Sequence, residues 1–198
     1  MYDETRGTPP HVAAAVTDAL LQTLRALAAH PHVLEVGIGT GRIAVPLAEA
    51  GVRITGIDIS EKMLDVLRSK NAAIDVMYAE AAHQPFRAKS FDAGLFVHIL
   101  HLVPDVEATV RESARVVRPG GLLVRVSDDH DEHGYHNQAG RLMWDVVDEI
   151  TGVKRPGGLM QGRGPSGDPH VNADAIFERV MNEMGTTLDR RVVLRYDA

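Results

Sequence analysis

Cysteine is missing from this sequence of 198 residues, and so is any long run of apolar residues. Without cysteine the chain can form no disulfide, no zinc–thiolate site and no thiol nucleophile. No stretch reaches the roughly 18 to 20 apolar residues that span a bilayer. Basic residues are in the minority, 21 against 27 acidic ones, which gives a formal net charge of −6. We therefore expect no attraction to nucleic acid or to an anionic membrane surface.

The composition is otherwise that of an ordinary globular domain. Hydrophobic residues make up 44% of the chain and charged residues 24%, close to the average for soluble proteins. We expect a single domain with a buried core. Asp3 and Glu4 lie in a polar N-terminal stretch, unlike the basic start and apolar run of a secretory signal. A cytoplasmic location is therefore the expectation.

Helical and strand-like stretches alternate along most of the chain. Apolar residues at helical spacing predict helices at 12–29, 43–50, 61–69, 105–117 and 173–184, and short apolar runs predict strands at 33–36, 52–57, 74–78, 91–96 and 122–126. Such strands are typical of a parallel sheet that is covered on both faces. We therefore predict an α/β fold with a doubly wound, mostly parallel sheet flanked by helices.

A glycine-rich turn follows the first predicted strand. Gly37, Gly39 and Gly41 stand close together there, and glycine lets the backbone bend sharply and approach a ligand. In a doubly wound sheet this turn lies where ligands bind. Arg42 occupies the third glycine position of the dinucleotide fingerprint, which the turn therefore does not match. A phosphate loop of the Walker kind is absent as well.

Two carboxylates flank this turn. Glu35 precedes it, and Asp58 ends the second predicted strand. Together they would repel a pyrophosphate but would suit a ligand with a positive centre and a ribose diol. The alternative for Asp58 is a negative charge at the start of the following helix, for which Ser60 is the predicted cap.

Four segments in order resemble the motifs of class I S-adenosylmethionine-dependent methyltransferases, in the small-molecule subgroup similar to methyltransferase type 11. The resemblance covers about residues 33–126. The segments are Val33–Gly41, Gly56–Leu64, Ala79–Asp92 and Arg115–Gly121. This resemblance implies a Rossmann-like methyltransferase fold with S-adenosyl-L-methionine as its cofactor.

The resemblance also implies residue roles. The first glycine motif would cradle the methionine end of the cofactor, and the acidic end of the second strand would hold the ribose hydroxyls. The adenine ring would contact the residues after that strand and the turn after the third strand, where the family usually has Asp at the position of Glu80. The implied cofactor residues are Glu35, Gly37, Gly39, Asp58, Ile59, Met63, Glu80, Ala81 and Val97. For Met63 the alternative is core packing.

Two histidines follow the fourth predicted strand, in the stretch Val97–Pro104. His98 and His101 are our candidate catalytic residues, because an oxygen acceptor needs a base near neutrality. Alternatively, the main chain of Val97 or His98 forms a wall for the cofactor's amino group, or both histidines are satisfied by loop carbonyls. His130, His133 and His136 lie in an acidic stretch, where we expect substrate contact and no metal.

We therefore expect S-adenosylmethionine-dependent methyl transfer to a small-molecule acceptor. The alternatives are a non-catalytic S-adenosylmethionine-binding module and an NAD-dependent oxidoreductase, which Arg42 disfavours. The single domain 1–198 would comprise an N-terminal arm and helix at 1–30, a cofactor-binding core at 33–127 and a substrate-side segment at 128–198. In that segment we predict a helix at 137–150, a loop at 151–169 and a strand at 188–196. This last strand has no evident partner, which suggests a homodimer through its edge.

Overall fold

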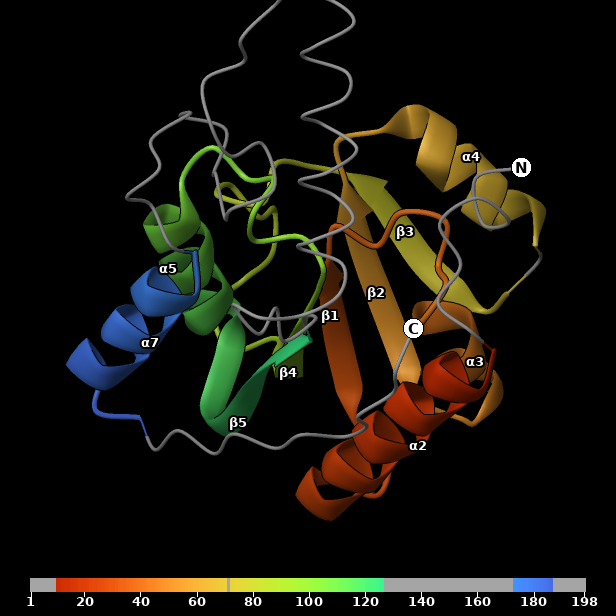
Figure 1. Cartoon of the computed structure of the whole chain (residues 1–198), viewed down its shortest axis with the longest axis horizontal. Helices are drawn as coiled ribbons and strands as arrows, with labels where there is room; N and C mark the ends of the chain where they lie inside the picture. Colours follow the sequence, from red (N-terminus) through yellow and green to blue (C-terminus); the bar gives the residue numbers. More distant parts are fainter. Residues whose placement is uncertain (1–9, 71, 127–172, 187–198) are drawn as a thin grey trace, which may run out of the picture.

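The structure is a computed structural model, and it describes residues 10–70, 72–126 and 173–186 (Figure 1). The predicted helix at 137–150, loop at 151–169, strand at 188–196 and histidines of the acidic stretch lie outside these residues. None of the helices in the described ranges is both long enough and apolar enough to cross a membrane.

The core of the fold is a parallel sheet in the order β3-β2-β1-β4-β5. Every neighbouring pair of these strands is parallel. The chain builds outward from β1 to β3 and then returns to the other side of β1, so the switch point lies between β1 and β4. This confirms the predicted doubly wound α/β class. The strands are β1 (His32–Val36), β2 (Arg53–Asp58), β3 (Ile74–Tyr78), β4 (Phe91–Val97) and β5 (Val117–Val126).

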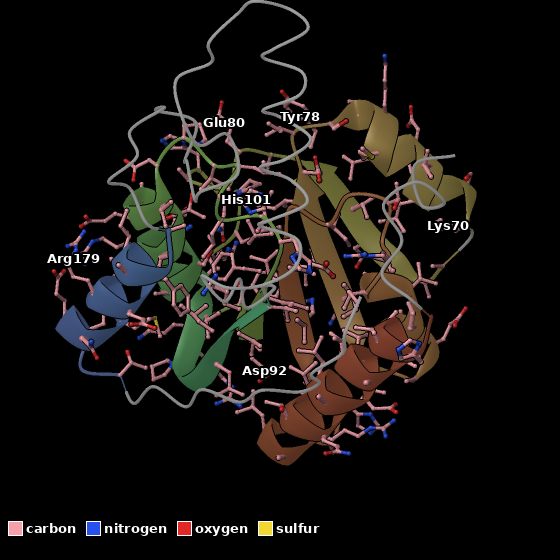
Figure 2. All side chains as sticks on the ribbon, in the orientation of Figure 1. Lys70, Tyr78, Glu80, Asp92, His101 and Arg179 are labelled. Carbon is pink, nitrogen blue, oxygen red and sulfur yellow. The ribbon has the colours of Figure 1, made fainter. Side chains whose placement is uncertain are left out.

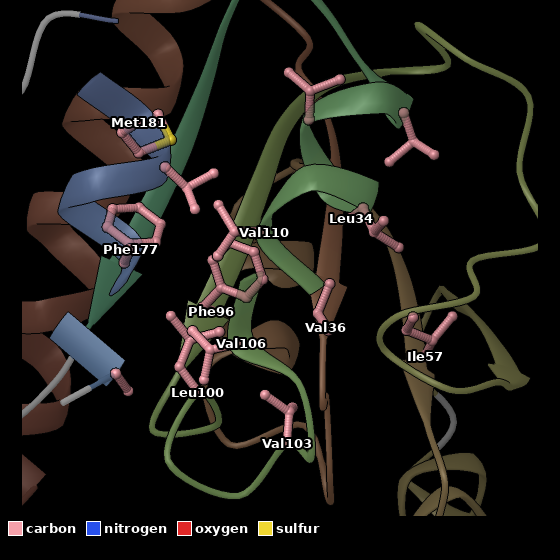
Figure 3. Packing of buried hydrophobic residues seen from close by; sticks show 14 of the residues in the cluster. Leu34, Val36, Ile57, Phe96, Leu100, Val103, Val106, Val110, Phe177 and Met181 are labelled. Atoms are coloured by element: carbon pink, nitrogen blue, oxygen red, sulfur yellow. The ribbon is translucent and has the colours of Figure 1, made fainter. Parts of the chain in front are cut away.

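Helices cover both faces of the sheet (Figure 1). On one face, α2, α3 and α4 pack over a core that includes Val33, Ile54 and Leu95. On the other face, α5 and α7 pack over alternate residues of the same strands, such as Leu34 and Phe96 (Figure 3). This alternation places a side chain of β1 on each face in turn. The helices are α2 (Pro10–Leu27), α3 (Ala44–Glu49), α4 (Glu61–Ser69), α5 (Val106–Val116) and α7 (Ala173–Glu183).

Polar caps begin the two helices that follow β2 and β4. The Ser60 hydroxyl accepts a hydrogen bond from the Met63 N–H at 3.4 Å, which confirms the predicted cap of α4. The Asp105 carboxylate accepts one from the Ala108 N–H at 2.8 Å and caps α5. Both caps fix where the chain turns back after leaving the carboxyl edge of the sheet.

The last described strand begins earlier than the sequence predicts. We predicted a helix at 105–117 and a strand at 122–126, with Pro119–Gly121 between them, whereas α5 ends at Val116 and β5 already starts at Val117. The strand accommodates Pro119–Gly121 through a shift in its register against the start of β4, between Phe91 and Ala93. Gly121 is needed there, because a Cβ at this position would lie 2.4 Å from the Asp92 carbonyl oxygen.

Candidate functional site

The predicted site residues gather at the carboxyl edge of the sheet, where β1, β2, β3 and β4 end. Figure 2 shows Glu80, Tyr78 and His101 toward this end, whereas Asp92, at the start of β4, lies at the opposite end. In doubly wound sheets this edge, beside the switch point, is where ligands bind. The structure therefore brings together on one edge residues that are separated by as much as 66 positions in the sequence, from Glu35 to His101.

The glycine turn after β1 is a left-handed bend with one tight and one open position. Gly37 and Gly39 both have positive φ angles, 71° and 55°. A Cβ on Gly37 would lie 2.3 Å from a side-chain carbon of Ile99, so the loop after β4 packs directly on this glycine. Among the residues that the structure describes, no atom lies within 4 Å of the place that a Cβ on Gly39 would take. The turn is therefore packed against Ile99 at Gly37 and has open space beside Gly39.

Asp58 holds the glycine turn in place. One carboxylate oxygen accepts a hydrogen bond from the Gly39 N–H at 2.8 Å, and the other accepts one from the Ser60 N–H at 2.8 Å. The carboxylate therefore faces the glycine turn and also meets the main chain just before α4. An ionised carboxylate offers about four lone-pair sites, so two backbone donors leave capacity for a diol.

Glu35 is a buried carboxyl beneath the glycine turn. It is only 2% exposed, and its Oε2 atom makes no hydrogen bond with the part of the chain that the structure describes. Burial raises the pKa of Glu35 from 4.5 to about 8, and the positive charge of Arg42 opposes part of this rise. The group is therefore neutral at pH 7 unless a further positive charge comes close to it.

The turn after β3 carries Glu80 and Ala81. It begins beside the second strand, because the Ala79 N–H donates to the Asp58 carbonyl at 3.1 Å. Glu80 is exposed and lies 3.2 Å from the ring of His83, measured from Oε2 to Nδ1. Ala81 is half-buried against the core under α5. The two residues therefore stand at the edge next to Asp58.

Ile59 and Met63 differ in how far they are buried. Ile59 follows Asp58 directly and, at 64%, is the most exposed of the large apolar side chains that the structure describes. Met63 is half-buried in the first turn of α4, whereas Leu64 and Leu67 of the same helix point into the core. The alternative of core packing for Met63 is therefore not favoured, and both side chains offer apolar surface near Asp58.

His98 and His101 lie just beyond β4, which ends at Val97. His98 has a φ of 50°, a left-handed conformation that is uncommon outside glycine and tends to occur at functional sites. Its N–H donates to the Val126 carbonyl at 3.0 Å and so joins this bend to β5. The side chain of His98 is half-buried and that of His101 is exposed. Val97, also half-buried, completes this part of the edge.

Sequence reasoning missed the residues that anchor the turn after β3. Gln84 lies in that turn and is 4% exposed, and its side chain reaches Ser113 on α5. A signal was available, since Ser113 stands at helical spacing on the apolar face of α5 and a buried hydroxyl requires a partner. The left-handed bend at His98 had no comparable signal in the sequence.

Comparison with known proteins shows which proteins this sequence is similar to. The family model described as "Methyltransferase domain" matches residues 34–125. A 27-O-demethylrifamycin SV methyltransferase from Amycolatopsis mediterranei is 35% identical over 129 residues, which cover 62% of this chain and 47% of that protein. An uncharacterized methyltransferase from Mycobacterium tuberculosis is 34% identical over 189 residues, 95% of this chain and 65% of that protein.

Solved structures agree on the fold. A SAM-dependent methyltransferase from Thermotoga maritima superimposes with a TM-score of 0.54 at 22% sequence identity, covering 85% of this chain and 72% of that one. The fold is thus that of a Rossmann-like α/β protein. Over residues 34–125 the chain matches the methyltransferase domain of class I S-adenosylmethionine-dependent enzymes of the type 11 subgroup. It spans about half the length of several curated relatives that it matches.

The residues at the carboxyl edge fit S-adenosylmethionine, the cofactor of this family. The buried Oε2 atom of Glu35 is an acceptor that a cationic group can satisfy. The open side of Gly39 leaves room for a ligand to approach the main chain. The carboxylates of Asp58 and Glu80, with the buried carboxyl of Glu35 that a nearby cation would ionise, favour a cationic ligand and disfavour a phosphate.

Proposed function

We propose that this chain transfers a methyl group from S-adenosylmethionine to a small-molecule acceptor. One observation carries the proposal, namely the acidic edge with the open glycine turn at its centre. When bound, the cofactor supplies a methyl group on a positively charged sulfur, which is activated toward nucleophiles without a metal. The protein then has to bind and orient two molecules and exclude water between them.

The binding role falls to the acidic edge. Glu35, with Gly37 and Gly39, would hold the methionine end, where an ammonium group would meet the buried carboxyl. Asp58 would accept hydrogen bonds from both ribose hydroxyls, since each of its oxygens has a lone pair left beyond its backbone partner.

Adenine would lie between the second and third strand ends. Ile59 and Met63 would pack against one face of the ring, which gives the exposed isoleucine an apolar partner. The Glu80 carboxylate would accept from the adenine amino group and the Ala81 N–H would donate to the ring. Glutamate is one methylene longer than the family's usual aspartate, and the contact with His83 limits where its carboxylate lies.

The histidines beyond β4 would serve the acceptor. A hydroxyl acceptor must lose its proton as its oxygen attacks, and an imidazole is basic enough to take it near neutral pH. His98 and His101 are our candidates for this base, and the strained main chain at His98 supports a functional reason for that bend. The name of the Amycolatopsis relative points to an O-methyl acceptor in that protein.

The decisive test supplies S-adenosylmethionine carrying a labelled methyl group together with a metabolite extract. We expect label in small-molecule products, and much less of it, at a cofactor concentration near the wild-type Kd, when the protein carries Asp58→Ala. A Glu49→Gln variant, which alters an exposed carboxylate of α3 away from the edge, should keep the activity. Binding of the cofactor without labelled product in any extract would instead favour a binding module.

A further inference from the structure

The turn that carries Glu80 and Ala81 is fastened to helix α5 by a buried amide. Gln84 is 4% exposed and Ser113 is 0% exposed. The Nε2 atom of Gln84 donates to the Ala81 carbonyl at 2.9 Å and to the Ser113 hydroxyl at 2.6 Å. One side chain therefore joins the turn to the helix at a place from which water is excluded, where hydrogen bonds hold geometry best.

The main chain of Gln84 is held as well. Its N–H donates to the Glu112 carboxylate at 3.0 Å, and its carbonyl accepts from Arg115 at 3.2 Å. Glu112 and Arg115 pair with each other at 2.7 Å, and this pairing lowers the pKa of Glu112. Glu112 is therefore ionised at neutral pH. Two charged side chains of α5 thus hold the main chain of Gln84, one at its N–H and the other at its carbonyl.

The hydrogen bonds of Gln84 constrain Ala81, the residue whose main chain is expected to bind the adenine ring. The Ala81 carbonyl belongs to the same residue whose N–H would donate to the adenine ring. A donor that holds this carbonyl restricts rotation of the main chain at Ala81. It also limits the orientation of the adjoining peptide group, which carries that N–H and begins at the Glu80 carbonyl.

We propose that Gln84 is a positioning residue that, anchored by Ser113 on α5, holds the Glu80–Ala81 turn in the orientation that recognises the adenine edge of the cofactor. This inference rests on the proposed function, because it requires adenine to lie at that turn. It adds a residue outside the cofactor edge that acts only through the residues in contact with the ligand.

Recognition of the adenine edge can be measured by changing that edge. S-inosylhomocysteine differs from S-adenosylhomocysteine in having a carbonyl in place of the amino group and an N–H in place of the ring acceptor. The carboxylate of Glu80 would then face an oxygen and the N–H of Ala81 would face a donor. We expect the protein to bind the adenosyl compound at least about tenfold more tightly, since each mismatched group loses a hydrogen bond.

The test measures this ratio of affinities by calorimetry in the full chain and in three variants. Gln84→Met keeps the length of the side chain and removes both donated bonds. Ser113→Ala removes only the anchor on α5. Thr109→Val is the matched control, because it deletes another fully buried hydroxyl of α5, one that bonds the Asp105 carbonyl within the helix at 2.7 Å.

We expect the ratio to fall to about threefold or less in Gln84→Met, to fall by a smaller factor in Ser113→Ala, and to stay at the wild-type value in Thr109→Val. Circular dichroism checks that each variant is folded. If Gln84→Met does not fold, the affinity ratio of Ser113→Ala is compared with that of Thr109→Val, and a lower ratio in Ser113→Ala supports the inference.

Different failures have different meanings. Folded variants of Gln84 and Ser113 that keep the wild-type ratio would overturn this inference while leaving the adenine contact intact. A wild-type protein that binds both compounds equally would overturn the placement of adenine, and the role of Gln84 with it. A wild-type protein that binds neither compound would overturn the proposed function itself.

Discussion

Replacing Glu35 by glutamine should flatten the pH dependence of this protein's stability. In the folded protein burial raises the pKa of Glu35 to about 8, against 4.5 for an ordinary glutamate. Between these values the folded state keeps a proton that the unfolded state has released. The free energy of unfolding therefore falls as the pH rises through this window. The stabilisation from the neutral carboxyl is complete below pH 4.5 and is lost as the pH passes about 8.

The magnitude follows from the width of the window. Each pKa unit corresponds to about 1.4 kcal/mol, so a window of about 3.5 units changes the free energy of unfolding by up to about 5 kcal/mol. This is large beside the total of about 5 to 15 kcal/mol that is typical of a domain. The amide of Glu35→Gln has nearly the same shape but does not ionise, so the variant lacks this contribution.

Urea denaturation followed by circular dichroism at pH 5, 7 and 8.5 measures the effect. The wild-type protein should lose several kcal/mol relative to Glu35→Gln over this range, most of it by pH 8.5. Glu49→Gln makes the same chemical change at an exposed position of α3 and should follow the wild-type curve. Parallel curves for the wild type and Glu35→Gln would refute the burial argument.

Ligand binding provides a second test of the protonation state of Glu35. A cation held against Glu35 favours its ionised form, so binding of S-adenosylhomocysteine at pH 7 should release a proton from the carboxyl. Calorimetry in buffers with different ionisation enthalpies detects this proton. Glu35→Gln should bind more weakly and release none. A wild-type protein that binds the compound without releasing a proton would show that its amino group lies elsewhere.

Three further predictions concern the edge of the sheet. Asp58→Ala should lower the affinity for S-adenosylhomocysteine by about tenfold or more while the fold survives, since two charge-assisted hydrogen bonds are lost. Calorimetry measures the affinity, with circular dichroism as the control for folding. An unchanged affinity would show that Asp58 only makes its hydrogen bonds to the main chain. If the acceptor is a hydroxyl, His98→Asn or His101→Asn should lower turnover strongly with little change in cofactor affinity, and a loss of affinity instead would assign that histidine to the pocket wall. Gly37→Ala places a Cβ 2.3 Å from Ile99 and should destabilise the fold by about 1 to 3 kcal/mol in urea, whereas wild-type stability would show that the loop after β4 moves freely.

Most of the fold was predictable because it depends on local patterns. The helix at 61–69 and the strand at 74–78 agree with the structure at both ends, since their apolar spacing and the Ser60 cap are short-range signals. The start of β5 was not predictable in this way. A Pro-Gly-Gly stretch favours a stop in isolation, and only the long-range pairing of Val117 with Phe91 extends the strand.

The site, like the fold, has features that local patterns predict and features that depend on long-range packing. The strand ends predicted that Glu35 and Asp58 would lie near one pocket, because the ends of parallel strands meet at one edge, and the family resemblance implied that Glu80 would lie beside them. The sequence could not predict that Asp58 would hold the Gly39 N–H, nor that Gln84 would reach α5, since both contacts depend on how distant segments pack. The left-handed bend at His98 is likewise joined to a distant strand, through the hydrogen bond from its N–H to the Val126 carbonyl.

A titration of the purified chain tests the central claim most directly. S-adenosylmethionine, S-adenosylhomocysteine and NAD are each added to the wild-type protein in a calorimeter, with Asp58→Ala as the matched variant. We predict binding of both adenosyl compounds, weaker binding in the variant, and little or no binding of NAD. Tight binding of NAD with no response to either adenosyl compound would contradict the account.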